Sequence, residues 1–354
     1  MNSKLHKFTY YFVTALITGC VLIMFVIFPG INDDKPSMFG DMIYGKASKP
    51  YVYRILLPAT VRVLSAPIPQ TLRNTISIKI EDSISLNKLF KKLKWEKELA
   101  VEYSFAMLIM FLSLWGFSIA VRHLFILFYN TSSWFADSVS VLALLGLPAM
   151  FQYTSFIYDF PLLLLYTLGL IFLYKQGWKK FLIIFLVGCI NKETTILLTL
   201  VFYIFYKSGL NKELFNKLLV AQLATFILVK SLLYFVFKNN PGTFIEFHLI
   251  DHNLRLLTGY DLTLAATVLG LVLLVLYKWN EKPKFLKTSL WMLIPLVIIT
   301  LLLGYLDELR DYYEVYPVVI IFIAHSFARI LNVNFKLNIQ YKFKKNPNLF
   351  AFYR

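Results

Sequence analysis

The chain has 354 residues, 58% of them hydrophobic, and a mean hydropathy of +0.64. Soluble domains contain about 45–50% apolar residues, so the excess predicts lipid-facing surface and argues against an ordinary soluble protein. The net charge of +16 is explained by Lys and Arg that collect in cytoplasmic loops and face anionic lipid. No base-reading motif accompanies this charge, so the expected partner is the lipid bilayer and not nucleic acid.

The apolar segments predict an all-α protein, a polytopic membrane helix bundle with about eight full spans, a re-entrant helical hairpin and a small outer loop subdomain. A spanning helix needs about 20 residues. Basic residues near the segment ends place both termini in the cytoplasm, and the protein is expected in a bacterial inner membrane. The expected spans are residues 8–29, 101–128, 136–153, 160–174, 218–237, 262–277, 290–305 and 317–330.

Three regions follow from this topology. Residues 1–29 form the first transmembrane helix, residues 30–100 an extracytoplasmic loop with juxtamembrane helices, and residues 101–354 the transmembrane bundle with its basic cytoplasmic tail. Residues 86–97 are basic and amphipathic, which suits a position in the membrane interface. They put many Lys and Arg outside, but long loops translocate largely regardless of charge. The tail carries Lys336, Lys342, Lys344, Lys345 and Arg354.

A short interrupted segment predicts the re-entrant hairpin. Residues 181–190 and 195–206 are apolar but each is too short to span, and Asn191-Lys192-Glu193-Thr194 separates them. Basic residues stand at both outer ends, which favours a hairpin of two half-helices with the polar tetrad at its tip. The alternative is a single tilted helix that contains a buried charged pair.

The expected outer face collects acidic and basic residues from distant parts of the chain. Cys20 and Cys189 lie in apolar stretches at different depths, so neither a disulfide nor a cysteine metal site is expected. His248 and His252 share a helical spacing, but the residue after His248 is Leu249, so no zinc-protease motif is formed. The candidate functional residues on this face are Asp34, Asp41, Arg54, Asp159, Lys192, Glu193, Glu308 and Arg310.

Each candidate has a structural and a functional interpretation. Asp34 either solubilises the first loop or takes part in a site, whereas Asp41 lies among apolar neighbours that can raise the pKa of a catalytic base. Arg54 either extends its charge to the interface or holds a phosphate through paired hydrogen bonds. Asp159 precedes Phe160-Pro161, as a helix N-cap would. The Lys192-Glu193 pair either neutralises itself or belongs to a site, since ionisable residues at membrane depth are costly.

The order of these motifs resembles the GT-C superfamily of integral-membrane glycosyltransferases, especially its poorly characterised bacterial members. The acidic first loop is followed by Pro50-Tyr51-Val52-Tyr53-Arg54, then by Tyr158-Asp159 at a helix start. Asn191-Lys192-Glu193-Thr194 stands between short helices, and Glu308-Leu309-Arg310-Asp311 precedes the last one.

The resemblance implies inverting transfer of a sugar from a polyprenyl-phosphate carrier to a surface glycan or glycolipid at the outer face. It assigns the base to Asp41, with Asp34 as rival. Glu193 is also predicted to be catalytic, because an ionisable residue at membrane depth is costly. Arg54, Lys192 and Arg310 are expected to bind the donor phosphate, with Asp159 and Glu308 beside them. No cofactor is expected, and a divalent metal, known in some relatives, is doubtful because Asp33-Asp34 is separated from Asp41. The alternative function is a polymerase or transporter of lipid-linked oligosaccharides.

Overall fold

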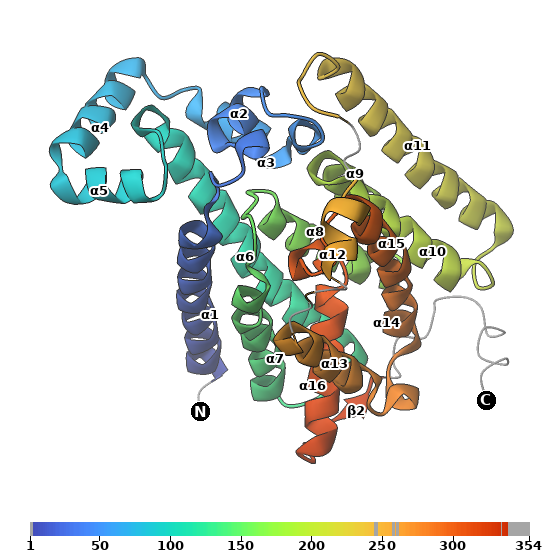
Figure 1. The fold of residues 1–354 in the computed structure, drawn as a ribbon. Coiled ribbons are helices and arrows are strands. Elements are labelled where there is room, and N and C mark those ends of the chain that lie inside the picture. Colours follow the sequence, from blue (N-terminus) through green and yellow to red (C-terminus); the bar gives the residue numbers. More distant parts are fainter. Residues whose placement is uncertain (1–2, 244–246, 257–258, 260–261, 334, 339–354) are drawn as a thin grey trace.

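The computed structural model describes residues 3–243, 247–256, 259, 262–333 and 335–338. The all-α prediction is confirmed, because helices make up nearly all regular structure in these residues (Figure 1). The exception is a two-residue antiparallel ladder between β1 (Tyr129–Asn130) and β2 (Lys336–Leu337). Most of the basic tail, from residue 339 onward, lies outside the described residues.

The bundle and its connecting segments contain sixteen α-helices within the described residues. The longer ones are α1 (Ser3–Phe25), α6 (Ala100–Phe128), α7 (Ser133–Leu145), α8 (Asp159–Tyr174), α9 (Trp178–Asn191), α10 (Leu197–Tyr206), α11 (Lys212–Val236), α13 (Leu262–Leu276), α15 (Leu293–Leu303) and α16 (Tyr316–Ile330). The others are α2 (Phe39–Tyr44), α3 (Leu56–Ser65), α4 (Gln70–Asp82), α5 (Ile84–Lys92), α12 (Leu254–Leu256) and α14 (Lys284–Ser289).

Five helical segments are long and apolar enough to cross a membrane, which fits an integral membrane protein in a lipid bilayer. They are Lys4–Gly30, Lys97–Phe128, Ser133–Met150, Lys212–Val236 and Lys284–Leu303. The other three predicted spans are helical but shorter, at Asp159–Tyr174, Leu262–Leu276 and Tyr316–Ile330. The count of eight full spans is therefore not reached by helix length in the described part of the chain.

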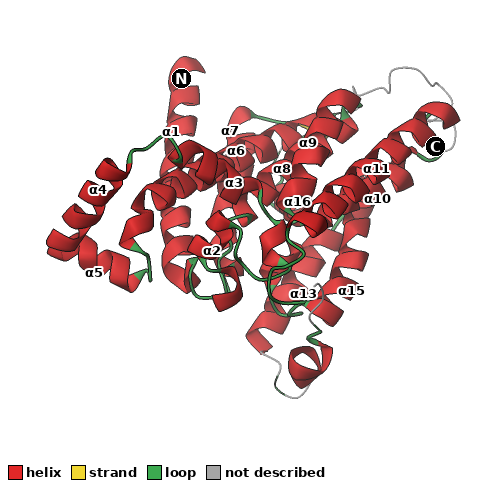
Figure 2. Ribbon diagram, turned by 90° about the horizontal axis from the view of Figure 1, so that it is seen from above, coloured by secondary structure: helices red, strands yellow, loops and turns green. Residues whose placement is uncertain are grey.

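The segment between α1 and α6 is largely helical and contains α2 to α5. Helices α4 and α5 project sideways from the bundle (Figures 1 and 2). An aromatic stack fixes α5, since the Phe90 ring lies 5.5 Å from Trp95, which stacks on Tyr103 at 4.1 Å. The predicted amphipathic stretch 86–97 is only partly helical, because α5 ends at Lys92.

Helices α9 and α10 fold back on one another. The ring of Trp178, the first residue of α9, lies 5.3 Å from that of Tyr206, the last residue of α10, so both outer ends lie together. Lys192 has an extended backbone (φ −154°, ψ 145°), which interrupts the helix between Asn191 and Glu193. The segment is thus a hairpin with the polar tetrad at its turn, and the alternative of one continuous helix is excluded.

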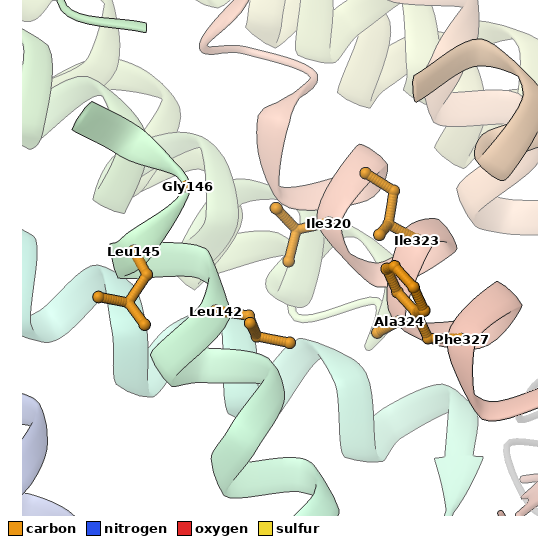
Figure 3. Close-up of a pocket in the computed structure, with 7 residues that line it drawn as sticks. All are labelled: Leu142, Leu145, Gly146, Ile320, Ile323, Ala324 and Phe327. Atoms are coloured by element: carbon orange, nitrogen blue, oxygen red, sulfur yellow. The ribbon is translucent and has the colours of Figure 1, made fainter. Parts of the chain in front are cut away.

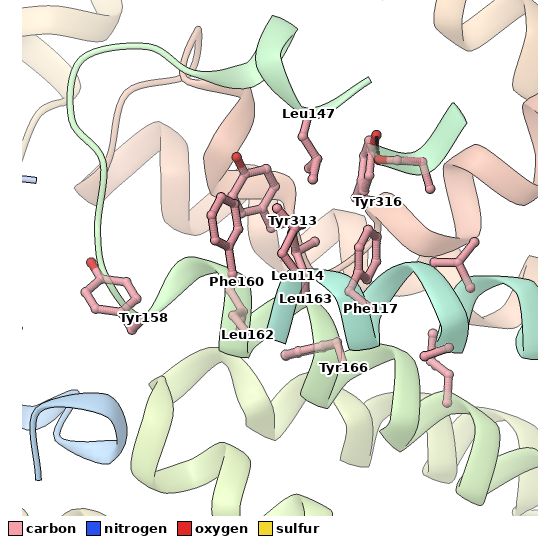
Figure 4. Close-up of a cluster of buried hydrophobic side chains, with 14 of the residues drawn as sticks. Leu114, Phe117, Leu147, Tyr158, Phe160, Leu162, Leu163, Tyr166, Tyr313 and Tyr316 are labelled. Carbon is pink, nitrogen blue, oxygen red and sulfur yellow. Dashed lines mark hydrogen bonds between the residues drawn. The ribbon is translucent and has the colours of Figure 1, made fainter. Parts of the chain in front are cut away.

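At one end of the bundle, the ends of several helices pack together. The ring of Phe25, at the end of α1, lies 4.4 Å from that of Phe160, at the start of α8. The hydroxyl of Tyr316, at the start of α16, donates to the carbonyl of Ala143 near the end of α7. A buried aromatic and aliphatic cluster supports this end from below (Figure 4). The loops at this end therefore pack against a buried hydrophobic cluster.

Candidate functional site

A cluster of charged side chains lies at this end of the bundle. It unites residues from the first loop, the start of α8, the turn of the α9–α10 hairpin and the loop before α16. The sequence candidates in it are Arg54, Asp159, Lys192, Glu193, Glu308 and Arg310. We call these residues, together with Glu314, the ion cluster.

Arg54 and Glu193 form the most accessible pair of the ion cluster. Nη2 of Arg54 lies 2.5 Å from Oε1 of Glu193, and Nε lies 3.4 Å from Oε2. The guanidinium also donates to the Tyr158 hydroxyl and lies 4.6 Å from the centre of that ring. The Glu193 side chain is 41% exposed and that of Arg54 is 11% exposed, so this pair forms the open edge of the cluster.

Lys192 pairs with Glu314, and this pair is more deeply buried than the Arg54–Glu193 pair. The Lys192 Nζ lies 3.0 Å from Oε1 of Glu314, and the Thr194 hydroxyl donates to the same oxygen at 2.5 Å. Glu314 is fully buried, and its Oε2 has no hydrogen-bond partner among the described residues. Lys192 and Glu193 thus pair with other residues, so the interpretation of a self-neutralising pair at the turn is wrong.

Arg310 joins two carboxylates at the back of the cluster. Its Nη2 and Nε lie 2.5 and 3.0 Å from Oε1 of Glu308, and its Nη1 lies 3.4 Å from Oδ2 of Asp159. The guanidinium lies 4.1 Å from the centre of the Phe156 ring. Burial raises the pKa of Glu308 to about 7, although the Arg310 charge opposes the shift. The pKa of Glu308 therefore lies above the usual range of a glutamate carboxyl.

Asp159 begins α8 as its first helical residue, and Tyr158 occupies the N-cap position. The Asp159 carboxylate accepts from the Phe156 backbone amide at 3.4 Å and from Arg310. Its negative charge also suits the positive end of the α8 dipole. The simple N-cap interpretation is therefore replaced by a role in the ion cluster.

The first-loop aspartates do not join the ion cluster through any contact in the described part of the chain. Asp34 accepts a hydrogen bond from the Ser37 hydroxyl at 2.6 Å. Asp41 lies in α2, where its backbone carbonyl accepts from Lys46 and Ala47. The Asp41 carboxylate forms no hydrogen bond or ion pair with the described residues. Of the two aspartates, only Asp34 therefore has a side-chain partner in this part of the chain.

Sequence reasoning did not select three residues that belong to this region. Glu314 lies beyond the Glu308-Leu309-Arg310-Asp311 motif, and Tyr158 belongs to the Tyr158-Asp159 motif, in which only Asp159 was a candidate. Lys230 lies within the apolar helix α11. Its Nζ is buried, without a hydrogen-bond partner among the described residues, and interacts electrostatically with Glu193. A charge inside an apolar helix was the available signal for Lys230.

The region is rich in charge but not in metal ligands. No group of three or more His, Cys, Asp or Glu side chains in the described residues is arranged to hold a metal ion. Each of the three cations Arg54, Lys192 and Arg310 instead contacts at least one carboxylate. The arrangement can bind an anion where that anion displaces or joins one of these carboxylates.

An apolar groove of about 260 Å³ lies between α7 and α16 (Figure 3). Its lining is Leu142, Leu145, Gly146, Ile320, Ile323, Ala324 and Phe327. Gly146 lies against Tyr316, and the Tyr316 ring lies 6.4 Å from that of Tyr313. Tyr313 in turn interacts electrostatically with Asp159 and Arg310. Tyr316 and Tyr313 therefore lie between the end of the groove and the ion cluster.

Comparisons of this chain with protein-family models, with curated proteins and with solved structures found no match.

Proposed function

We propose that the protein is a glycosyltransferase that moves a sugar from a polyprenyl-phosphate carrier to a surface glycan or glycolipid. The reaction takes place at the outer face of a bacterial inner membrane, with both termini in the cytoplasm. The observation that carries the proposal is the accessible Arg54–Glu193 pair in front of two buried cations, Lys192 and Arg310.

The donor phosphate binds first at the open edge of the ion cluster. A guanidinium presents two parallel N–H donors to a phosphate as it does to a carboxylate. The phosphate therefore takes the place of Glu193 on Arg54, and Glu193, already 41% exposed, turns toward water. Releasing an exposed carboxylate costs less than releasing the enclosed Glu314 or Glu308.

The buried cations stabilise the leaving group. When the bond between the sugar and the phosphate breaks, negative charge grows on the phosphate oxygens. Fixed positive groups in a site with little water stabilise such charge strongly. Glu308 assists because its raised pKa of about 7 lets it take up a proton when the phosphate arrives, which removes one negative charge beside Arg310.

The groove between α7 and α16 supports a lipid-linked donor. It is lined by apolar side chains, and Leu142, Leu145 and Phe327 are half exposed along it. In a bilayer these side chains face acyl chains, so part of an isoprenoid tail can enter from the membrane. The buried residues Tyr316 and Tyr313 pack between the end of the groove and the Arg310 side of the ion cluster.

The test is mass spectrometry of polyprenyl-linked sugars and surface glycans in cells that lack the gene. The cells are complemented with the wild type, with Arg54→Gln or with the control Arg62→Gln, which changes an exposed arginine of α3. We expect one sugar to be missing with Arg54→Gln and restored by the wild type and the control. Unchanged glycans in the deletion strain would refute the proposal, and shortened chains of normal composition would favour the polymerase.

A further inference from the structure

A second group of titratable side chains, which takes no part in binding the phosphate, lies beside the ion cluster. His252 Nε2 lies 2.8 Å from Oδ1 of Asp307, and the Tyr153 hydroxyl donates to Oδ2 of the same carboxylate. The Tyr305 ring packs on the imidazole, with ring centres 4.1 Å apart. A histidine whose partner carboxylate is itself fixed by a third group is the arrangement of an oriented base.

The hydrogen bond determines which ring nitrogen carries the proton. The carboxylate of Asp307 accepts a hydrogen bond from the Nε2–H group of His252. The neutral ring is therefore protonated at Nε2, and Nδ1 keeps its lone pair. Nδ1 of His252 has no hydrogen-bond partner among the described residues. The His252 side chain is 26% exposed, whereas that of Asp307 is 12% exposed. The ring is thus the accessible member and the carboxylate the enclosed one.

Tyr153 remains a donor to Asp307 at neutral pH. Burial raises the pKa of its hydroxyl above the usual value, and the hydrogen bond to Asp307 adds to the shift. Tyr153 also interacts electrostatically with Glu308. Asp307 and Glu308 are consecutive, so their Cα atoms lie about 3.8 Å apart. The group of His252, Asp307 and Tyr153 therefore borders the Arg310 side of the ion cluster.

We infer that His252 is the general base of the transfer, an inference that rests on the proposed function. Nδ1 takes the proton of the acceptor hydroxyl, and the acceptor oxygen forms a bond to the anomeric carbon of the donor sugar. The bond between that carbon and the phosphate oxygen breaks, and its electron pair stays on the phosphate beside the cations. Asp307 is a positioning residue that holds the ring and stabilises the imidazolium.

This assignment differs from the role that the family resemblance gives to Asp41. The Asp41 carboxylate has no contact with the ion cluster in the described part of the chain. His252 is instead connected, through Asp307, to the loop that carries Glu308 and Arg310. Four residues before it, His248 pairs with Asp251 at 3.1 Å and packs on Tyr305, with ring centres 5.0 Å apart. His248 is therefore the matched control.

The experiment measures sugar transfer by mass spectrometry in the deletion strain complemented with His252→Gln, His248→Gln, Asp41→Asn and Arg54→Gln. Equal amounts of each protein in the membrane and a single elution peak show that the variants fold. Loss of a general base lowers the rate by roughly 10²–10⁴-fold. We expect that loss for His252→Gln, and we expect His248→Gln and Asp41→Asn to retain transfer.

Imidazole in the medium separates a base from a structural residue. His252→Gly leaves space for the added base, and we expect imidazole to restore part of its product. If imidazole restores nothing, or if His252→Gln transfers normally while Arg54→Gln does not, the inference is overturned and the proposed function stands. If Arg54→Gln and the deletion leave glycans unchanged, the proposed function fails and the role of His252 fails with it.

Discussion

The raised pKa of Glu308 predicts a specific dependence of stability on pH. The shift from 4.5 to about 7 corresponds to roughly 3 kcal/mol, at about 1.4 kcal/mol per pKa unit. Because the folded state binds this proton more tightly than the unfolded state, the stabilisation is complete below pH 4.5. It is lost as the pH rises through about 7. The difference in stability between the wild type and Glu308→Gln isolates the contribution of this carboxyl from other effects of pH.

The assay is thermal unfolding of the purified protein in detergent between pH 4.5 and 8. We expect the wild type to lose stability relative to Glu308→Gln as the pH rises, by an amount that approaches roughly 3 kcal/mol. Because glutamine cannot ionise, the lost interaction with Arg310 changes the free energy of unfolding by the same amount at every pH. If the difference in stability between the two proteins stays constant over this range, the pKa of Glu308 is not raised by folding.

Three further predictions follow from the same geometry. Lys192→Met leaves Glu314 buried without its cation and should cost about 3–5 kcal/mol; adding Glu314→Gln should recover much of it, and additive losses in a double-mutant cycle would contradict the pairing. Thr194→Cys, in a background without Cys20, should react with an impermeant thiol reagent only from the outer face; labelling only from the cytoplasm would overturn the proposed hairpin topology. Leu142→Trp should fill the groove and slow transfer at unchanged protein level, whereas Ile183→Trp, which changes an exposed position of α9, should leave it normal.

The hairpin of α9 and α10 could be predicted from the sequence, because the lengths of the apolar segments and the positions of the basic residues both favoured it. Two apolar segments too short to span flank the polar tetrad around Lys192, and basic residues stand at both outer ends. The pairing of Lys192 with Glu314 was not accessible, because it depends on how the start of α16 approaches the turn of the hairpin. Residues far apart in sequence supply the partner, and no local pattern encodes that approach.

The choice of Asp41 shows how a local pattern can have another cause. Its apolar neighbours suggested a site of low dielectric constant. In the structure these neighbours, Phe39 and Met42, are buried, and Phe39 stacks on Tyr103 with ring centres 4.1 Å apart. Packing of α2 against α6 therefore accounts for the apolar neighbours of Asp41, and the catalytic role of Asp41 stays a prediction.

The number of spans was the least predictable part of the fold. Hydropathy identified the apolar segments, and each of the eight contains a helix. Helix length depends on where the backbone leaves the helical conformation. Helix α8 begins only at Asp159, after an irregular loop, and ends at Tyr174 before Gln176, which has a positive φ of 53°. Such ends are determined by tertiary contacts more than by hydropathy.

In the proposed function, the ion cluster binds a lipid-linked phosphate through Arg54. The most direct test of this binding is native mass spectrometry of the purified full-length protein mixed with polyprenyl phosphate, with Arg62→Gln as control. We predict one bound molecule on the wild type and the control, and at least tenfold weaker binding for Arg54→Gln. Equal binding by Arg54→Gln, or no binding by the wild type, would contradict this proposal.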